Sequence, residues 1–301
     1  MKVLLVGASG YIGSVVLEHL LKDGHEVVAL VRTTRSLPFR VEQRVADLSR
    51  PESMLPVLAA DVDAVVHAGA PIGDWDVEIA SVHSLLRGLR GGRRTFVYLS
   101  GTWVLGPSPS AGAVAPVLDE FSPVRPIELV KGRERLEETV TDAQGCRGVV
   151  IRPGLVHGRG GGIPGLLVDW ARQHGVGRFV ATERPTSWPM VHVDDVAALV
   201  SRVLVDDAGG QLIHAVAEPG VAVQHIAAAA DVAAGGPGRT EPWPLAEAGH
   251  ALGVAFAEAL ATSQHVRGLE APSLGWHPTR PGVVEDLRRG SYQRLPDLAA
   301  S

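Results

Sequence analysis

Three glycines near the N-terminus have the spacing that binds a dinucleotide pyrophosphate. Residues 7–13 read GASGYIG, after a short apolar run and before an apolar helical pattern. In this context Gly7 permits a tight turn, Gly10 lets the backbone approach a pyrophosphate, and Gly13 lets the helix pack close to the strand. The helix N-terminus adds free N–H groups and a partial positive charge. The segment therefore predicts a dinucleotide site; the alternative is a tight turn that binds nothing.

Two arginines after the next apolar run bear on the identity of the nucleotide. Residues 26–31 predict the second strand of a βαβ unit, and Arg32 and Arg35 follow it. An NAD site usually has an acid there, which holds the ribose 2′-hydroxyl. A guanidinium suits a 2′-phosphate, which it grips with paired hydrogen bonds. We therefore expect NADP(H) to be favoured over NAD(H); if Arg32 is only a solvated loop residue, the site accepts both.

Strand and helix patterns alternate through the first half of the chain and predict the elements that position these residues. Further strands are predicted at 41–45, 63–67, 95–100 and 148–151, and helices at 51–60, 77–90 and 128–141. This alternation predicts an α/β fold with a Rossmann-type doubly wound parallel sheet. Ligands of such sheets lie at the carboxyl ends of the strands. The small residues Ala68, Gly69 and Ala70 follow the fourth strand, where they leave room for a cofactor.

Beyond Gly154 the pattern loosens and predicts a smaller C-terminal substrate lobe. We expect a dinucleotide-binding Rossmann domain at 1–153 and a mainly substrate-binding lobe at 154–301, with elements near 190–216 returning to the first domain. Helices are predicted at 163–174, at 194–204 with Asp194 or Asp195 near the cap, at 223–234 and at 244–261, and a strand at 211–216. The glycine-rich segment 157–165 is predicted to be a flexible loop, and the proline-containing tail to be irregular.

The composition narrows the class of protein. The chain has 301 residues, of which 46% are hydrophobic, so it can bury a substantial core. Its net charge of −5, without a basic block, gives no support for nucleic-acid binding. One cysteine excludes an intrachain disulfide and fits a reducing, cytoplasmic location. We see no signal peptide or membrane-spanning stretch, and no cluster with metal-ligand spacing, so we expect neither a membrane partner nor a metal.

With these motifs identified, nearly the whole chain resembles the short-chain dehydrogenase/reductase superfamily, most closely its extended branch of NAD-dependent epimerase/dehydratase proteins. The matching segments are the glycine turn, Asp47-Leu48, residues 67–70, residues 97–106, residues 152–158 and residues 192–197. The resemblance implies that Asp47 contacts adenine. The implied cofactor contacts are Gly7, Ser9, Gly10, Tyr11, Ile12, Gly13, Arg32, Arg35, Asp47, Leu48, Ala68, Gly69, Ala70, Lys131 and Pro153.

The catalytic pair of that family is incomplete in this chain. The resemblance implies a Tyr-x-x-x-Lys pair on the helix after the fifth strand, with tyrosine as general acid or base and lysine holding the ribose. None of the three tyrosines lies on that helix. If Lys131 is the lysine, Ile127 stands in the tyrosine position. If the helix is shifted by one pair, Arg133 and Leu129 fill the two positions.

A ketone reduction needs a proton donor as well as a hydride, and a placed donor contributes about 10²–10⁴-fold to the rate. The family's Ser/Thr position falls on Gly101, and Ser100 and Thr102 flank it. The catalytic candidates are Ser100, Thr102, Lys131 and His157. Each also has a structural interpretation, as a backbone-bonded, solvated or packed side chain. The proton can come from one of these groups or from water, the substrate can be reduced at a carbon–carbon double bond, or the hydride chemistry is lost.

We predict an NADP(H)-dependent oxidoreductase or epimerase-like enzyme that acts on a small, fairly apolar metabolite with a non-standard proton donor. The alternatives are a non-redox cyclase, isomerase or lyase on the same scaffold, and a nucleotide-sensing regulator. Trp103, Trp170 and Trp188 line an apolar pocket in one interpretation and belong to the core in the other. The resemblance also implies a homodimer formed through the helices near 77–90 and 128–141.

Overall fold

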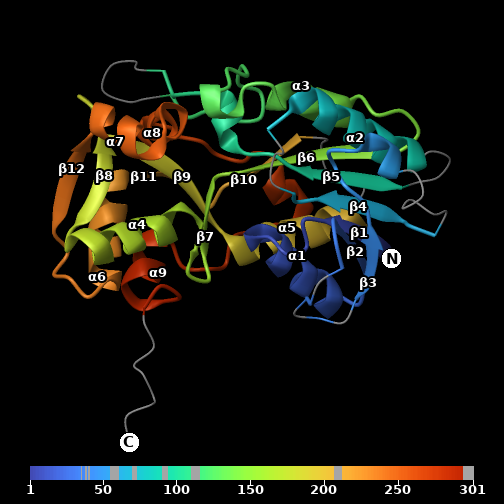
Figure 1. Ribbon diagram of the computed structural model, residues 1–301, viewed down its shortest axis with the longest axis horizontal. Coiled ribbons are helices and arrows are strands. Elements are labelled where there is room, and N and C mark those ends of the chain that lie inside the picture. The colour runs from blue at the N-terminus through green and yellow to red at the C-terminus, as the bar shows by residue number, and fades with distance from the viewer. Residues whose placement is uncertain are drawn as a thin grey trace, which may run out of the picture.

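A parallel β-sheet forms the frame of the N-terminal half. The computed structural model describes residues 1–34, 36–37, 39, 41–54, 61–69, 73–89, 94–109, 116–206 and 212–293. The strands are β1 (Lys2–Val6), β2 (Glu26–Val31), β3 (Glu42–Val45), β4 (Ala64–His67), β5 (Thr95–Leu99), β6 (Arg147–Pro153) and β10 (Leu212–Ala215). They form one seven-stranded sheet in the order β10-β6-β5-β4-β1-β2-β3 (Figure 1), and every pairing in it is parallel. The predicted α/β fold with a Rossmann-type doubly wound sheet is confirmed.

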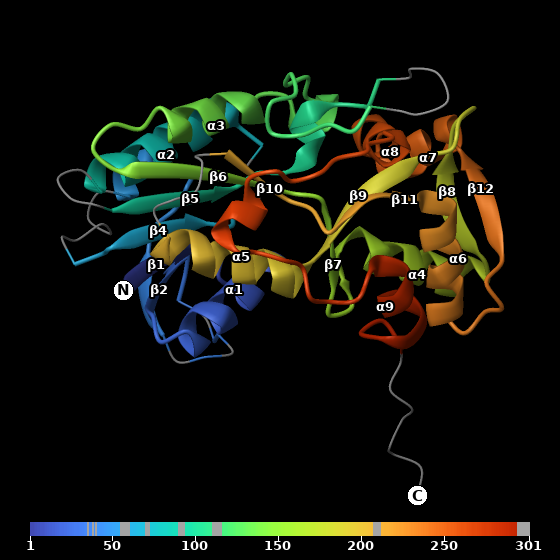
Figure 2. The same cartoon turned by 180° about the vertical axis from the view of Figure 1, so that it is seen from behind.

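Helices cover both faces of this sheet. Helices α1 (Tyr11–Lys22) and α5 (Val193–Val205) pack on one face, and α2 (Trp75–Gly88) and α3 (Arg133–Thr141) on the other (Figures 1 and 2). Alternate strand residues point to opposite faces, so Val3 and Leu5 join the core under α1 and α5, whereas Leu4 and Val6 join the core under α2 and α3. The continuous apolar runs in the sequence follow from burial on both faces.

The rest of the chain forms a second lobe beside the carboxyl ends of the sheet strands (Figure 1). Its elements are β7 (Leu155–Gly158), α4 (Gly162–His174), β8 (Gly177–Ala181), β9 (Ser187–His192), β11 (Glu218–Ala222), α6 (Val223–Ala233), β12 (Thr240–Pro244), α7 (Leu245–Leu252), α8 (Val254–Ala261) and α9 (Val283–Arg289). The strands form a three-stranded sheet, β11-β9-β7, and a two-stranded sheet, β12-β8. A separate apolar core lies between these elements.

Two predicted helices are wrong as continuous elements. The segment 128–141 is a 3₁₀ turn (Glu128–Val130) followed by α3, because the backbone at Gly132 takes a left-handed φ of 102° that a helix cannot contain. The segment 244–261 is α7 followed by α8, because Gly253 between them has a φ of 87°. Both predictions were extended across a glycine that the periodicity alone does not mark as a break.

Other boundaries of the C-terminal lobe also differ from the predictions. The tail is not irregular throughout, since α9 lies within it, and segment 157–165 is the end of β7 and the start of α4. Strands β8, β11 and β12 were not predicted, because two of them are rich in polar residues or proline. Asp194 and Asp195 lie in the first turn of α5, near its cap as predicted, and the cap itself is His192, whose Nδ1 accepts a hydrogen bond of 3.2 Å from the N–H of Asp194. Of the predicted helix 51–60, residues 51–53 form a 3₁₀ turn and 55–60 lie outside the described residues.

Two properties of the described residues concern a membrane and a metal ion as partners. None of the helices in the described ranges has the length and apolar character that a membrane crossing requires. Within the same ranges, no group of three or more His, Cys, Asp and Glu side chains is arranged to hold a metal ion.

Candidate cofactor site and reaction edge

The glycine turn after β1 has the shape of a pyrophosphate cradle. Gly7 has a φ of 85°, and a Cβ there would lie 2.6 Å from the carbonyl oxygen of Ala68. A Cβ on Gly13 would lie 2.0 Å from the carbonyl oxygen of Gly7. The first turn of α1 can therefore pack this closely against the glycine turn only because residue 13 has no side chain. No side chain caps α1 at Gly10, which leaves the N–H groups of the first turn available to an anionic ligand. These features fit a dinucleotide cofactor.

The residues around the turn differ in exposure and in their contacts. Ser9 is exposed, and Ile12 is half-buried against the core under α1 and α5. The hydroxyl of Tyr11 donates a hydrogen bond of 2.8 Å to the carbonyl oxygen of Gly158, and its ring fills the space beside Gly161. Tyr11 therefore joins the two lobes, and its cofactor contact stays a prediction.

The predicted adenine end gathers beside β2, β3 and β4. The side chain of Arg32 is exposed at the end of β2. The backbone N–H and hydroxyl of Ser49 lower the pKa of Asp47 by hydrogen bonding, and the charge of Arg32 acts in the same direction. A methyl group of Leu48 lies 3.6 Å from the position that a Cβ of Gly69 would take. The predicted contacts Arg35 and Ala70 lie outside the described residues.

Ser100 is held in a buried network at the end of β5. Its hydroxyl donates a short hydrogen bond to Glu137 of α3. Arg152 of β6 donates to the same carboxylate from Nε, at 3.0 and 3.2 Å, and from an Nη at 2.6 Å. All three side chains are buried. Because the hydroxyl hydrogen of Ser100 is directed to Glu137, this network ties β5, α3 and β6 together rather than presenting a donor to a substrate.

Lys131 and His157, two of the other catalytic candidates, have environments different from that of Ser100. The side chain of Lys131 is 68% exposed, and its Nζ lies 3.4 Å from a carboxylate oxygen of Glu128. His157 is buried on β7, with its Nδ1 3.6 Å from Asp286 and its ring centroid 5.2 Å from that of His192. The structure therefore does not bring Lys131 and His157 together.

The segment after β5 contains the remaining candidate. Thr102 begins a 3₁₀ turn (Thr102–Leu105) and is 1% exposed, and its Oγ1 has no hydrogen-bond partner within the described ranges. The next residue, Trp103, is half-buried between two apolar clusters with an Nε1 that is likewise without a partner there. Trp170 and Trp188 instead lie in the core of the C-terminal lobe.

Arg133 lies beside Gly101 although it was not predicted as a site residue. An Nη of Arg133 lies 3.6 Å from the position that a Cβ of Gly101 would take, and the carbonyl oxygen of Pro153 lies at 4.0 Å from the same position. The guanidinium carbon lies 5.8 Å from the ring centroid of Trp75. Burial lowers the pKa of His67 to about 4, and the charge of Arg133 acts in the same direction. The signal in the sequence was the shifted register, in which Arg133 takes the lysine position.

The three tyrosines all have structural environments of their own. Tyr11 bonds to the 158–161 loop as described above. The hydroxyl of Tyr292 donates a bond of 2.6 Å to the carbonyl oxygen of Gly161 and accepts one of 2.7 Å from the N–H of Gly158. Tyr98 is 1% exposed in the core under α2 and α3, and burial raises the pKa of its phenol. No tyrosine therefore takes the family position.

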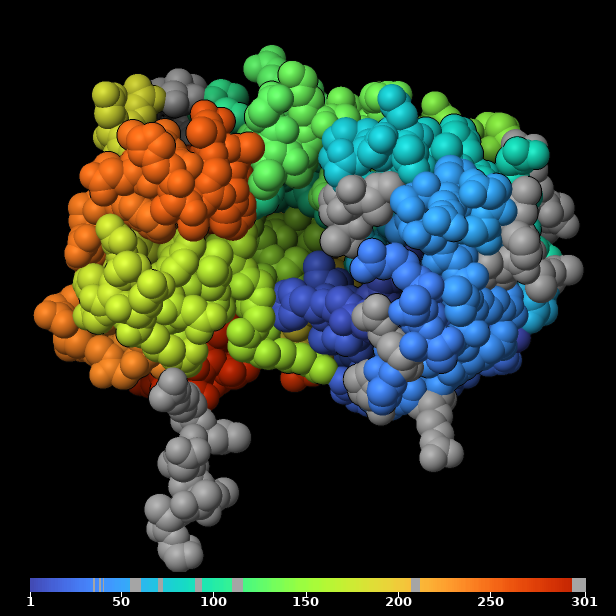
Figure 3. Space-filling model, viewed as in Figure 1, coloured from blue at the N-terminus to red at the C-terminus, as the bar shows by residue number. Residues whose placement is uncertain are grey.

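The surface has a hollow between the two lobes. In Figure 3 a depression lies between the deep-blue N-terminal residues and the yellow-green residues of the C-terminal lobe, below the green segment that precedes α3. This is the side on which the sheet strands end, which is where open parallel sheets bind their ligands.

Known proteins resemble this chain over most of its length. An uncharacterised protein of Saccharomyces cerevisiae is 28% identical over 96% of this chain and 98% of its own length. The 3-diazoavenalumate denitrifying reductase of a Streptomyces species is 29% identical over 96% of this chain and all of its own length.

Solved structures show the same fold. The UDP-glucose 4-epimerase of Thermus thermophilus, in complex with NAD, superposes with a TM-score of 0.76 at 21% identity over 97% of this chain and 99% of that one. A human epimerase family protein, solved with NADPH, gives a TM-score of 0.74 at 21% identity over the same shares. The sequence profile of the NAD dependent epimerase/dehydratase family matches residues 3–216. The chain therefore belongs to the NAD dependent epimerase/dehydratase family.

Proposed function

We propose that the protein is an NADP(H)-dependent reductase of a small, fairly apolar metabolite, working without the family's tyrosine. Family membership supports an enzyme of the epimerase or reductase type that uses a nicotinamide dinucleotide. Two features argue against ordinary sugar-nucleotide epimerisation, which relies on a tyrosine base: Leu129 or Ile127 stands in that position, and the three tyrosines are placed elsewhere. The full-length Streptomyces relative is by its name a reductase of a diazo compound, which supports a reductive function.

The residues at the carboxyl edge have distinct parts in this proposal. The glycine turn and the first turn of α1 would hold the pyrophosphate, Asp47 and Leu48 the adenine, and Arg32 a 2′-phosphate. When bound, the reduced nicotinamide ring supplies a hydride. Gly101 and Pro153 would flank the nicotinamide end. Gly101 has no side chain, which leaves room for a flat ring, and Pro153 contributes its carbonyl oxygen.

The observation that carries the proposal is the set of groups around Gly101. The Nη of Arg133 and the carbonyl oxygen of Pro153 are the atoms nearest to its missing Cβ. A guanidinium donates hydrogen bonds but keeps its proton, and the hydroxyl hydrogen of Ser100 is directed to Glu137. We infer that the proton of the reduction comes from water. This suits an acceptor such as a conjugated carbon–carbon double bond, whose carbon can be protonated from solvent.

A calorimetric titration with NADPH and NADH tests the cofactor assignment. We expect NADPH to bind more tightly, and the Arg32→Ala variant to lose about tenfold or more of its NADPH affinity while its NADH affinity changes little, because charge-assisted bonds to phosphate contribute about 1.5–3 kcal/mol. Gly10→Leu should abolish binding of both nucleotides, since side-chain atoms would enter the pyrophosphate position. Equal losses for NADPH and NADH in the Arg32 variant would contradict the NADP preference.

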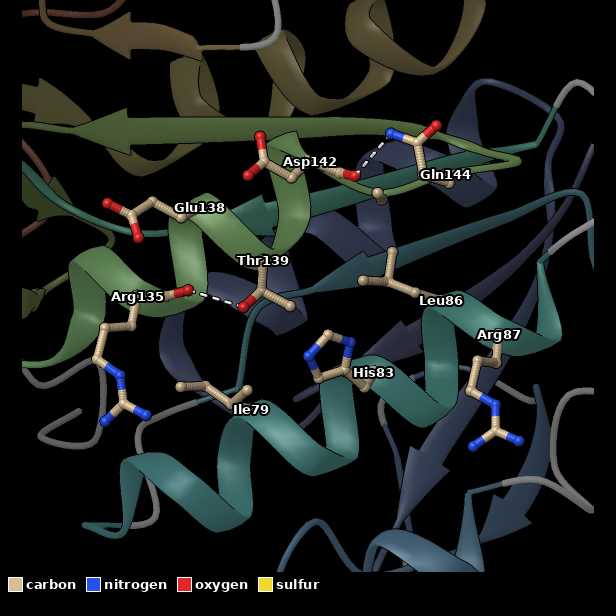
Figure 4. Close-up of a pocket in the computed structure, with 10 residues that line it drawn as sticks. Ile79, His83, Leu86, Arg87, Arg135, Glu138, Thr139, Asp142 and Gln144 are labelled. Atoms are coloured by element: carbon tan, nitrogen blue, oxygen red, sulfur yellow. Dashed lines mark hydrogen bonds between the residues drawn. The ribbon is translucent and has the colours of Figure 1, made fainter.

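The homodimer stays a prediction, and we propose the outward face of α2 and α3 as its interface. A groove of about 640 Å³ runs between the two helices, with Ile79 and His83 on one side and Arg135 and Thr139 on the other (Figure 4). Sedimentation equilibrium of the wild-type protein should give twice the monomer mass. A charge reversal in the groove, Arg135→Glu, should then yield monomers; a wild-type monomer would contradict the proposal.

A further inference from the structure

Arg133 is a cation without a counter-charge at the reaction edge. Within the described ranges it makes no hydrogen bond or ion pair, and its Nε is buried without a partner. Other arginines nearby are paired: Arg152 with Glu137 at 2.6 Å, and Arg135 with Asp76 at 2.8 Å. Placing a desolvated donor without an acceptor is costly, so this arrangement is expected where a ligand supplies the acceptor.

The position of the guanidinium is set by its neighbours. Gly132 has a φ of 102°, and a Cβ there would lie 2.5 Å from the indole ring of Trp75, so the backbone passes directly against that ring. The following residue, Arg133, then lies with its guanidinium carbon 5.8 Å from the ring centroid. A cation near an aromatic ring is stabilised by the quadrupole of the ring, while its N–H groups remain free for hydrogen bonds.

We propose that Arg133 binds the substrate through an anionic oxygen group, and that the substrates are small carboxylates with an apolar body. This inference rests on the proposed function, because it places the substrate beside the nicotinamide end of the cofactor site. A guanidinium is a planar fork that matches the two oxygens of a carboxylate. Its Nη lies at the end of β5, 3.6 Å from the Cβ position of Gly101, so a bound carboxylate would lie beside the nicotinamide ring rather than in its place.

The surroundings of Arg133 indicate the apolar part of the ligand. Leu129, four residues earlier, is 38% exposed although it is a large aliphatic side chain. Trp103 follows Thr102 on the segment after β5 and is only half-buried. Of the acids along α3, Glu134 accepts a hydrogen bond of 2.8 Å from the N–H of Gly132 and Glu137 is held by Arg152 and Ser100, and neither pairs with Arg133. The ring shown beside the cation is the indole of Trp75, and an apolar surface next to a cation suits an aryl or alkyl carboxylate better than a sugar.

Binding of an unreactive carboxylate separates this inference from catalysis. The protein is saturated with NADP⁺, which has no hydride to donate, and titrated with benzoate or with benzamide as its neutral counterpart, which cannot reduce NADP⁺, followed by ligand-observed NMR. The variants are Arg133→Gln, Arg133→Lys and the control Arg172→Gln, which removes an exposed arginine that pairs with Asp169 on α4. NADP⁺ affinity is measured separately for each protein.

We expect wild-type protein to prefer benzoate, and Arg133→Gln to bind benzoate about tenfold or more weakly. Arg133→Lys should bind it with intermediate affinity, because it keeps the charge and loses the fork. The control should match wild type, and NADP⁺ affinity should change by less than about threefold in all variants.

Three outcomes would overturn the inference. They are equal binding of benzoate and benzamide, unchanged benzoate binding in Arg133→Gln, and no detectable benzoate binding by wild type at concentrations up to about 10 mM. A parallel loss of NADP⁺ affinity would assign Arg133 to the cofactor instead. Failure of wild type to bind NADP⁺ at all would count against the proposed function, and is visible before benzoate is added.

Discussion

At the scale of residues, the buried Glu137 fixes which side of α3 faces the carboxyl end of β5. Glu137 points into the sheet because it binds Arg152 and Ser100. Residues four apart lie on the same side of a helix, so Arg133 also faces the sheet, and Lys131, two residues earlier, is turned to solvent. The sequence contained both registers, and nothing in the residue pattern alone showed which one the fold would adopt.

Restoring a tyrosine tests the register directly. In Leu129→Tyr a phenol takes the tyrosine position of the register in which Arg133 takes the lysine position, so we expect reduction of benzaldehyde by NADPH to rise by about tenfold or more over wild type. Ile127→Tyr is the control, because Ile127 packs against the cluster around Val104 and should give no gain. The initial rate of NADPH oxidation is the measurement. A gain in the control alone would assign the site to the other register.

The buried network has a measurable structural cost. Glu137→Gln leaves the buried guanidinium of Arg152 without a counter-charge, which should lower the free energy of unfolding by about 3–5 kcal/mol. The neighbouring Glu138 is exposed, so Glu138→Gln should change it by less than about 0.5 kcal/mol. Urea denaturation of both variants gives the comparison. Similar values for the two would mean that the network contributes little.

At the scale of elements, sequence patterns worked best where burial is simple. Apolar runs marked the strands of the central sheet other than the polar edge strand β3, because both faces are covered. They failed for β11 and β12, which include Pro219, Pro242 and Pro244 and do not resemble ordinary strands. The break at Gly132 was also out of reach, since it depends on Trp75, which lies far away in the chain. Tertiary contacts of this kind produce no periodic pattern in the sequence.

Gly132 offers a test of that contact. An alanine there must adopt a φ of 102° and would bring its Cβ within 2.5 Å of the indole of Trp75, so we expect Gly132→Ala to cost about 1–3 kcal/mol and to displace Arg133. Gly175 also has a positive φ, of 70°, but a Cβ there would meet nothing within 4 Å. Gly175→Ala should therefore cost only about 1 kcal/mol. Thermal and urea unfolding of the two variants separates strain from collision.

At the scale of the whole molecule, the 158–161 loop joins the two lobes. Arg159 in this loop binds Asp194 of α5 at 2.6 Å and Glu18 of α1 at 2.5 Å, while Tyr11 and Tyr292 bond to its backbone. The sequence predicted a flexible loop here, because glycines dominate it. Glycine was instead required for several left-handed turns that bring these partners together, and the partners come from both ends of the chain. Composition could not reveal that convergence.

Buried histidines should make the whole fold sensitive to mild acid. Burial lowers the pKa values of His67, His192 and His214 in the native state, to about 4 for His67. The unfolded chain takes up protons near the ordinary value of about 6.5, so it binds more protons than the folded protein between those values. Stability is therefore complete above about pH 6.5 and falls as the pH drops toward 4.

His67 should account for a defined part of this loss. Between pH 7 and pH 5 its contribution is about 2 kcal/mol, so the free energy of unfolding of His67→Leu should depend less on pH than that of wild type by that amount. His67 packs between Phe96 and Tyr98, and leucine keeps that contact apolar. His225 is exposed and lies outside the proposed dimer groove, so His225→Leu is the matched control and should not reproduce the effect of His67→Leu. Urea denaturation at the two pH values measures both slopes. Parallel slopes for wild type and His67→Leu would contradict the prediction, because they would mean that His67 has the same pKa in the folded and unfolded protein.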